Sequence, residues 1–142
     1  MNIKDELAYA YNEIIAAQEY NEGEVRYTVD DLINDYKELK EIIKKPIYRS
    51  IQLRDIKELD YNQLGEYWTN VKEMAFSYEG NGGNDYVVEA KVKMDDVDIG
   101  GTLIARRLFP EEEIRLKSER KVYVTNIYYD GKPLNISGEY FT

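Results

Sequence analysis

The apolar residues of this chain follow one period before Pro46 and another after it. In the first part they recur every three to four positions, and from Ile47 onward they alternate with polar residues. A period near 3.6 is typical of an amphipathic helix, and alternation is typical of a strand with one buried face. The sequence therefore predicts a single α+β domain over residues 1–142, helical in 1–46 and mostly β in 47–142.

Two amphipathic helices are predicted before Pro46. The first covers residues 5–20 and stops near Gly23. The second follows Thr28, whose hydroxyl suits an N-cap, with acidic residues in its first turn and lysines in its last. The two helices are therefore expected to pack against the β part.

Short strands and two further helices are predicted after Pro46. The predicted strands are 47–51, 64–69, 86–94, 114–116, 122–124 and about 134–141, and the predicted helices are 70–78 and 102–108. Residues 95–101 are expected to form a turn, and Asp130-Gly131 is a hairpin signal.

The composition excludes several kinds of catalysis. The chain has no cysteine and no histidine. Serine–histidine triads, histidine bases, thiolate nucleophiles and the common zinc sites are therefore all ruled out. Any catalysis has to use carboxylates, hydroxyls, arginine, lysine or tyrosine, and we expect no metal.

The charge of the chain constrains its partners. It carries 28 acidic and 19 basic residues, for a formal net charge of −9. Such a surface repels nucleic acid and anionic membranes and favours a basic protein partner. No segment approaches the roughly 20 apolar residues of a membrane span, and the N-terminus lacks an apolar signal core. We therefore expect a cytoplasmic protein, in a bacterium or an infected bacterial host, with no membrane partner.

Three consecutive glutamates precede the strand at 114–116. Alternation places Ile114 and Leu116 toward the core, Glu111 and Glu113 on the opposite face, and Glu112 apart from them. Residues two apart on a strand lie roughly 6 to 7 Å apart along the backbone, so Glu111 and Glu113 could serve one substrate. Charges that protect a hydrophobic strand from aggregation are the simpler explanation of such a run.

Arg49 lies in the first predicted strand, on one face with Ile47 and Ile51. Alternation alone favours a structural arginine in an edge strand, with its aliphatic stem buried.

Three motifs, taken in order, resemble the ADP-ribosyltransferase family of the arginine–serine–glutamate type. They are Tyr48-Arg49-Ser50 on a strand, Tyr67-Trp68-Thr69 before a helix, and Glu111-x-Glu113 at the start of a late strand. The likeness covers about residues 47–130 and is greatest to small bacterial and phage members. It implies a split β-sheet around an NAD cleft, with the N-terminal helices on its flank.

The resemblance implies a role for each matching residue. Arg49, followed by Ser50, would bind a phosphate of NAD, for which the fork of a guanidinium is suited. Glu113 would be the catalytic glutamate, and Glu111 the first acid of the pair, which goes with arginine as the acceptor. The carboxylate would stabilise the oxocarbenium-like ribose that forms as nicotinamide leaves.

The middle motif departs from the family pattern, in which Ser-Thr-Ser is frequent. Tyr67, Trp68 and Thr69 occupy this cofactor-binding segment. Thr69 would support the catalytic glutamate through its hydroxyl. Trp68 stands at the first serine, where it either lines the nicotinamide pocket or belongs to the core.

The implied function is that of an NAD-dependent mono-ADP-ribosyltransferase that modifies a basic protein, with arginine as the expected acceptor. A nucleic-acid-binding host or defence protein would be such a target. Two alternatives stay open. An acidic domain of this size could inhibit a nucleic-acid-handling complex as a mimic without catalysis, and the same site could hydrolyse NAD with water as acceptor.

Overall fold

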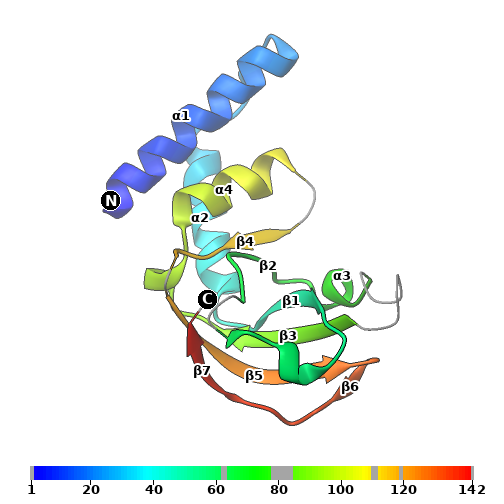
Figure 1. Ribbon diagram of the computed structural model, residues 1–142. Coiled ribbons are helices and arrows are strands. Elements are labelled where there is room, and N and C mark those ends of the chain that lie inside the picture. Colours follow the sequence, from blue (N-terminus) through cyan, green and yellow to red (C-terminus); the bar gives the residue numbers. More distant parts are fainter. Residues whose placement is uncertain (1, 62–63, 78–84, 110–111, 119, 142) are drawn as a thin grey trace.

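The computed structural model describes residues 2–61, 64–77, 85–109, 112–118 and 120–141 (Figure 1). Within these residues the chain forms four α-helices and seven strands, which confirms the predicted α+β class. The helices are α1 (Ile3–Glu22), α2 (Val29–Ile42), α3 (Lys72–Ser77) and α4 (Ile99–Leu108). The strands are β1 (Ile47–Gln52), β2 (Tyr67–Thr69), β3 (Asp85–Lys91), β4 (Glu113–Arg115), β5 (Lys121–Tyr129), β6 (Lys132–Pro133) and β7 (Gly138–Phe141).

The described strands form one antiparallel sheet in the order β4-β2-β1-β3-β5-β6, with β7 also paired to β5. The resemblance implied a sheet split around a cleft, whereas these hydrogen-bond ladders run through a single sheet. The ladder is weakest between β1 and β2, which share the single registered pair Tyr48–Thr69. The neighbouring ladder between β1 and β3 runs from Ile47–Ala90 to Gln52–Asp85.

The core lies on one face of the sheet. Strand side chains on this face are fully or almost fully buried, together with side chains of α1, α2 and α4. The strand members of this core are Ile47, Trp68, Tyr86, Val88, Ala90, Ile114, Val122, Val124 and Ile127. The short helix α3 packs on the other face, where Ala75 and Val87 are buried and the rings of Phe76 and Tyr128 form a T-shaped contact.

The two N-terminal helices form as their sequence signals predict. Thr28 and Asp31 make a reciprocal capping box at the start of α2, and Gly23 ends α1 in the left-handed region with φ of 70°. The helix α1 packs across α4, and Figure 1 shows both at the end of the molecule away from β5, β6 and β7. The approach is close at Gly100, where a Cβ would lie 3.2 Å from the carbonyl oxygen of Glu6.

Several predicted boundaries differ from the structure by a few residues, and two of these differences have a clear local cause. The strand predicted to reach residue 94 ends at Lys91, because Met94 opens a 3-10 turn. The helix predicted from Thr102 begins at Ile99, since the Asp98 side chain caps it by accepting a hydrogen bond from the N–H of Gly101. The hairpin predicted at Asp130-Gly131 is confirmed, with φ of 52° and 73° at these two residues between β5 and β6.

Candidate functional site

Thr69 and Glu113 lie directly opposite each other on the neighbouring strands β2 and β4. Opposed residues of an antiparallel pair project to the same face of the sheet, so both side chains share one face. Trp68 and Ile114, the next pair along, point to the other face and are buried in the core. The predicted orientation of Glu113 away from Ile114 is therefore confirmed.

Arg115 holds the carboxylate of Glu113. Its Nε donates a short hydrogen bond to Oε2 of Glu113, and its Cζ lies 5.3 Å from the centre of the Tyr67 ring. The pKa of Arg115 is raised, first because of the hydrogen bond to Glu113. The Glu113 side chain is 19 % exposed, so this ion pair is only partly open to solvent.

The hydroxyl of Thr69 accepts a hydrogen bond of 3.1 Å from the backbone N–H of Val71. This contact fixes the chain where it leaves β2 and enters α3. The Thr69 hydroxyl keeps its own proton for a second hydrogen bond. The strand register therefore places the Thr69 side chain beside Glu113. The hydrogen bond from Val71 holds the Thr69 hydroxyl at the segment that leads into α3.

Arg49 projects to the opposite face from Thr69 and Glu113. Tyr48 pairs with Thr69, and Arg49 follows Tyr48 in the strand and pairs with the buried Val88. The strand β1 lies between β2 and β3, so the interpretation of Arg49 as an edge-strand residue is wrong.

The guanidinium of Arg49 lies next to the chain that enters β2. Its NH1 donates a hydrogen bond of 2.6 Å to the carbonyl oxygen of Tyr67. Its Nε is buried and has no hydrogen-bond partner among the described residues. Burial lowers the pKa of this guanidinium.

The absence of a side chain at Gly65 leaves room for the guanidinium of Arg49. A Cβ at Gly65, which has φ of +93°, would lie 2.6 Å from Cζ of Arg49. The Gly65 carbonyl accepts a hydrogen bond of 2.9 Å from Nε1 of Trp68, whose side chain is 3 % exposed. Trp68 therefore lies in the core and fixes the loop that covers Arg49.

The remaining predicted site residues are dispersed. Ser50 alternates with Arg49 and shares a face with Tyr48, and the Tyr67 side chain is 54 % exposed. Glu111 lies outside the described residues. Glu112 has φ of 51° and pairs at 2.7 Å with Arg106, so it stands apart from Glu113 as predicted.

The sequence did not identify Glu89, which lies in the same row of the sheet as Glu113. The registered pairs connect Glu113, Thr69, Tyr48 and Glu89 across β4, β2, β1 and β3. A glutamate on the polar face of an alternating strand suggests solvent exposure, so alternation alone gave no signal. Only the strand order shows that Glu89 faces hydroxyl groups from neighbouring strands.

Two hydroxyls bind the carboxylate of Glu89 from β5. Thr125 donates a hydrogen bond of 2.6 Å to Oε1, and Tyr128 donates one of 2.9 Å to Oε2. Burial, followed by the hydrogen bond to Glu89, raises the pKa of Tyr128 to about 12. The pKa of Tyr48 is also raised, first by burial and then by the charge of Glu89.

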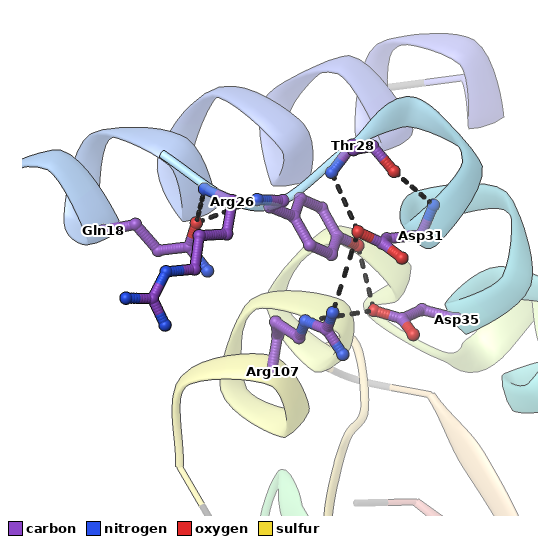
Figure 2. Close-up of polar contacts among 7 residues, drawn as sticks. Gln18, Arg26, Thr28, Asp31, Asp35 and Arg107 are labelled. Carbon is purple, nitrogen blue, oxygen red and sulfur yellow. Dashed lines mark hydrogen bonds and ion pairs between the residues drawn. The ribbon is translucent and has the colours of Figure 1, made fainter. Parts of the chain in front are cut away.

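A second polar cluster joins the helices, as Figure 2 shows. The Tyr27 hydroxyl donates a hydrogen bond of 2.9 Å to Asp35, and Arg107 of α4 lies 3.9 Å from Asp31 and 4.0 Å from Asp35. Burial and the contact with Asp35 raise the pKa of Tyr27. Gln18 accepts hydrogen bonds from the backbone of the 26–27 segment. These contacts link α4 to α2 and connect the segment before α2 to α1.

Comparisons of the chain with protein-family profiles, with curated proteins and with solved structures each found no match. Among the described residues, no three acidic side chains are grouped so that they could hold a metal ion. None of the helices in the described part of the chain has the length and apolar character needed to cross a membrane.

Proposed function

We propose that this chain is an NAD-dependent mono-ADP-ribosyltransferase with an ADP-ribosyltransferase-like fold and Glu113 as its catalytic carboxylate. The adjacency of β4, β2 and β1 carries the proposal. These three strands hold Glu113, Thr69 and Arg49, which are far apart in the sequence. Residues of one active site have to come from neighbouring elements, and the sheet order meets that requirement.

The chemistry suits a carboxylate in this position. The bond between C1′ of the ribose and the nicotinamide nitrogen breaks, and its electron pair leaves with nicotinamide. The ribose then carries positive charge, which Glu113 stabilises through the ribose hydroxyls more strongly than in the ground state. A guanidinium nitrogen of the target bonds to C1′ and loses a proton to a second carboxylate, the role proposed for Glu111.

Arg115 orients the carboxylate of Glu113 in the protein without substrate. Only Oε2 of Glu113 is bonded to Arg115, and within the described residues Oε1 accepts no hydrogen bond. A ribose hydroxyl can therefore approach Oε1 while Arg115 keeps the carboxylate oriented.

Arg49 has a free donor for a phosphate of NAD. Its Nε–H is buried beneath the loop at Gly65 and lacks an acceptor among the described residues, so a phosphate oxygen would supply one with the right charge once that loop moves aside. Because Arg49 and Glu113 project to opposite faces, bound NAD would reach both at the junction of β1 and β2, where the strands share one registered pair. Ser50, Tyr67 and Thr69 flank this junction, and Trp68 supports it from the core side.

The proposal is tested by incubating the purified protein with labelled NAD and a lysate of bacterial cells. We expect label to be transferred to a basic protein by the wild type and not by Glu113→Gln. Glu41→Gln, which removes a charge from an exposed ion pair on α2, is the matched control and keeps transfer. Label that stays protein-bound in Glu113→Gln would contradict the proposal.

The same experiment separates the alternatives. Free labelled ADP-ribose with no modified protein would identify an NAD glycohydrolase. The net charge of −9 favours an acidic inhibitor that mimics nucleic acid as the second candidate. For such a protein NAD would be intact after incubation and would not raise the melting temperature.

A further inference from the structure

A groove of about 500 Å³ lies at one end of the sheet, beside Lys91 of β3, Tyr123 of β5 and Glu139 of β7. It is distinct from the site proposed above, because Arg49, Thr69 and Glu113 are not among the residues that line it. Its volume is in the range of pockets that bind small organic ligands.

The groove is richer in basic residues than the chain as a whole. The described residues that line it include four bases and three acids, whereas the whole chain has 19 bases and 28 acids. The bases are Lys91, Lys93, Arg120 and Lys121, and the acids are Asp95, Asp96 and Glu139. A local excess of positive charge in a chain of net charge −9 favours an anionic ligand.

Three of these bases are available to a ligand. In the described part of the chain, the charged groups of Lys91, Lys93 and Arg120 have no hydrogen-bond or ion-pair partner. Lys121 differs, since it lies 3.5 Å from Glu139. A phosphate group could therefore bind three cations without displacing a protein carboxylate.

An aromatic ring stands among these cations. Tyr123 pairs with Lys91 on β3 and with Glu139 on β7, so the three side chains form a row across the sheet. Its neighbours Val122 and Val124 are fully buried on the other face, whereas Tyr123 is 53 % exposed. A half-exposed ring between cations is the arrangement that stacks a nucleobase beside its phosphate.

We propose that this groove binds a nucleoside phosphate, either free or as one unit of a single-stranded nucleic acid. The free cations bind the phosphate, and the Tyr123 ring stacks on the base. The carboxylates of Asp95 and Asp96 accept hydrogen bonds from ribose hydroxyls or base amino groups. This combination distinguishes a nucleoside phosphate from a plain polyanion, which offers no ring to stack and for which the carboxylates would be repulsive.

The test measures binding of adenosine monophosphate, adenosine, inorganic phosphate and a short single-stranded adenylate oligonucleotide by calorimetry. Tyr123→Leu is expected to weaken binding of adenosine monophosphate about tenfold, because it removes the stacking contact. Lys93→Gln combined with Arg120→Gln is expected to weaken it by about tenfold and to flatten its salt dependence.

The controls show whether a loss of binding comes from the groove itself, from changes elsewhere on the surface or from loss of folding. Tyr20→Leu changes a tyrosine that is 90 % exposed on α1, and Lys57→Gln combined with Lys132→Gln removes two exposed charges elsewhere. These variants should bind as the wild type does, and thermal melting shows whether every variant is folded. The readout is the difference between the wild type and the groove variants, and none of the groove residues belongs to the proposed transferase site, so failure of the transferase activity leaves this result unaffected.

Each outcome decides the proposal. Tighter binding of the oligonucleotide, with a steeper salt dependence, identifies a single strand as the source of the nucleoside phosphate, and equal binding identifies the free nucleotide. The proposal is overturned if the wild type binds no adenosine monophosphate, if inorganic phosphate binds as tightly, or if the groove variants bind as the wild type does.

Discussion

The guanidinium of Arg49 lies against the backbone of Gly65, so closely that a Cβ at Gly65 would stand 2.6 Å from Cζ of the arginine. The loop that contains Gly65 is held in turn by Trp68, which donates to the Gly65 carbonyl. The first and second motifs of the proposed site therefore share a contact that depends on the absence of a side chain at position 65.

Gly65→Ala is expected to destabilise the fold by about 3 kcal/mol, because it adds backbone strain at φ of +93° and a clash with Arg49. Chemical denaturation measures this loss. Gly131→Ala is the matched control, since Gly131 also has positive φ but open space at its Cβ. The control should lose only about 1 to 2 kcal/mol. Equal losses in the two variants would mean that Arg49 does not occupy this space.

Arg106 connects the start of α3 to the residue before β4. It donates hydrogen bonds of 2.7 Å to Asn70 and to Glu112, and its side chain is 14 % exposed. Arg106→Gln should lower the free energy of unfolding by about 1 to 2 kcal/mol, since the half-buried Asn70 and the partly exposed Glu112 both lose a charged donor. Arg26→Gln, at a side chain that is 70 % exposed, should change it by less than about 0.5 kcal/mol. A denaturation series in which both variants behave alike would remove this role from Arg106.

Glu6 of α1 caps a helix that begins 93 residues later. Its Oε1 accepts a hydrogen bond of 3.2 Å from the backbone N–H of Ile99, and its side chain is buried. We expect Glu6→Ala to cost about 1 to 2 kcal/mol of stability and Glu6→Gln less, because glutamine keeps an oxygen acceptor. Glu13→Ala, on an exposed position of the same helix, is the control in thermal melting. A loss as large in Glu6→Gln as in Glu6→Ala would assign the effect to charge rather than to the cap.

The burial of Tyr128, together with its contact with Glu89, predicts a dependence of stability on alkaline pH. The pKa of Tyr128 is about 12 in the folded protein and 10.0 in the unfolded chain. The protonated phenol is therefore favoured by folding, and its contribution is complete below pH 10 and lost as the pH rises toward 12.

Glu89→Gln should make this decline shallower, because it removes the charge that opposes ionisation of Tyr128. The free energy of unfolding, measured at a series of pH values across that interval, gives the comparison. Glu139→Gln on β7 is the control and should leave the decline unchanged. A decline of the same slope in Glu89→Gln and the wild type would contradict the assigned contact.

Local patterns predicted much of the fold. The helix periodicity, the Thr28 cap and the Asp130-Gly131 turn all act over a few residues, so the sequence displays them directly. Alternation also gave the faces of Arg49 and Glu113 correctly. It could not show that β1 lies inside the sheet, because pairing with β2 and β3 depends on contacts between distant segments.

The candidate site also depends on pairing between distant segments, which the sequence pattern does not show. Alternation assigns a residue to a face of its own strand, but it does not relate the faces of two strands to each other. Register does so, and it places Arg49 on the face opposite to Thr69 and Glu113. The surroundings of Glu89 and the contact of Glu6 with Ile99 likewise arise from pairings that no local pattern contains.

Release of nicotinamide from NAD tests the central claim most directly. The wild type, Glu113→Gln and Glu41→Gln are each incubated with NAD and a simple guanidine compound as acceptor, and free nicotinamide is quantified over time. We predict that the wild type and Glu41→Gln release nicotinamide. In Glu113→Gln the rate of release should fall by a factor of about 100 or more. Release at the same rate in Glu113→Gln as in the wild type, or no release by the wild type, would contradict the account.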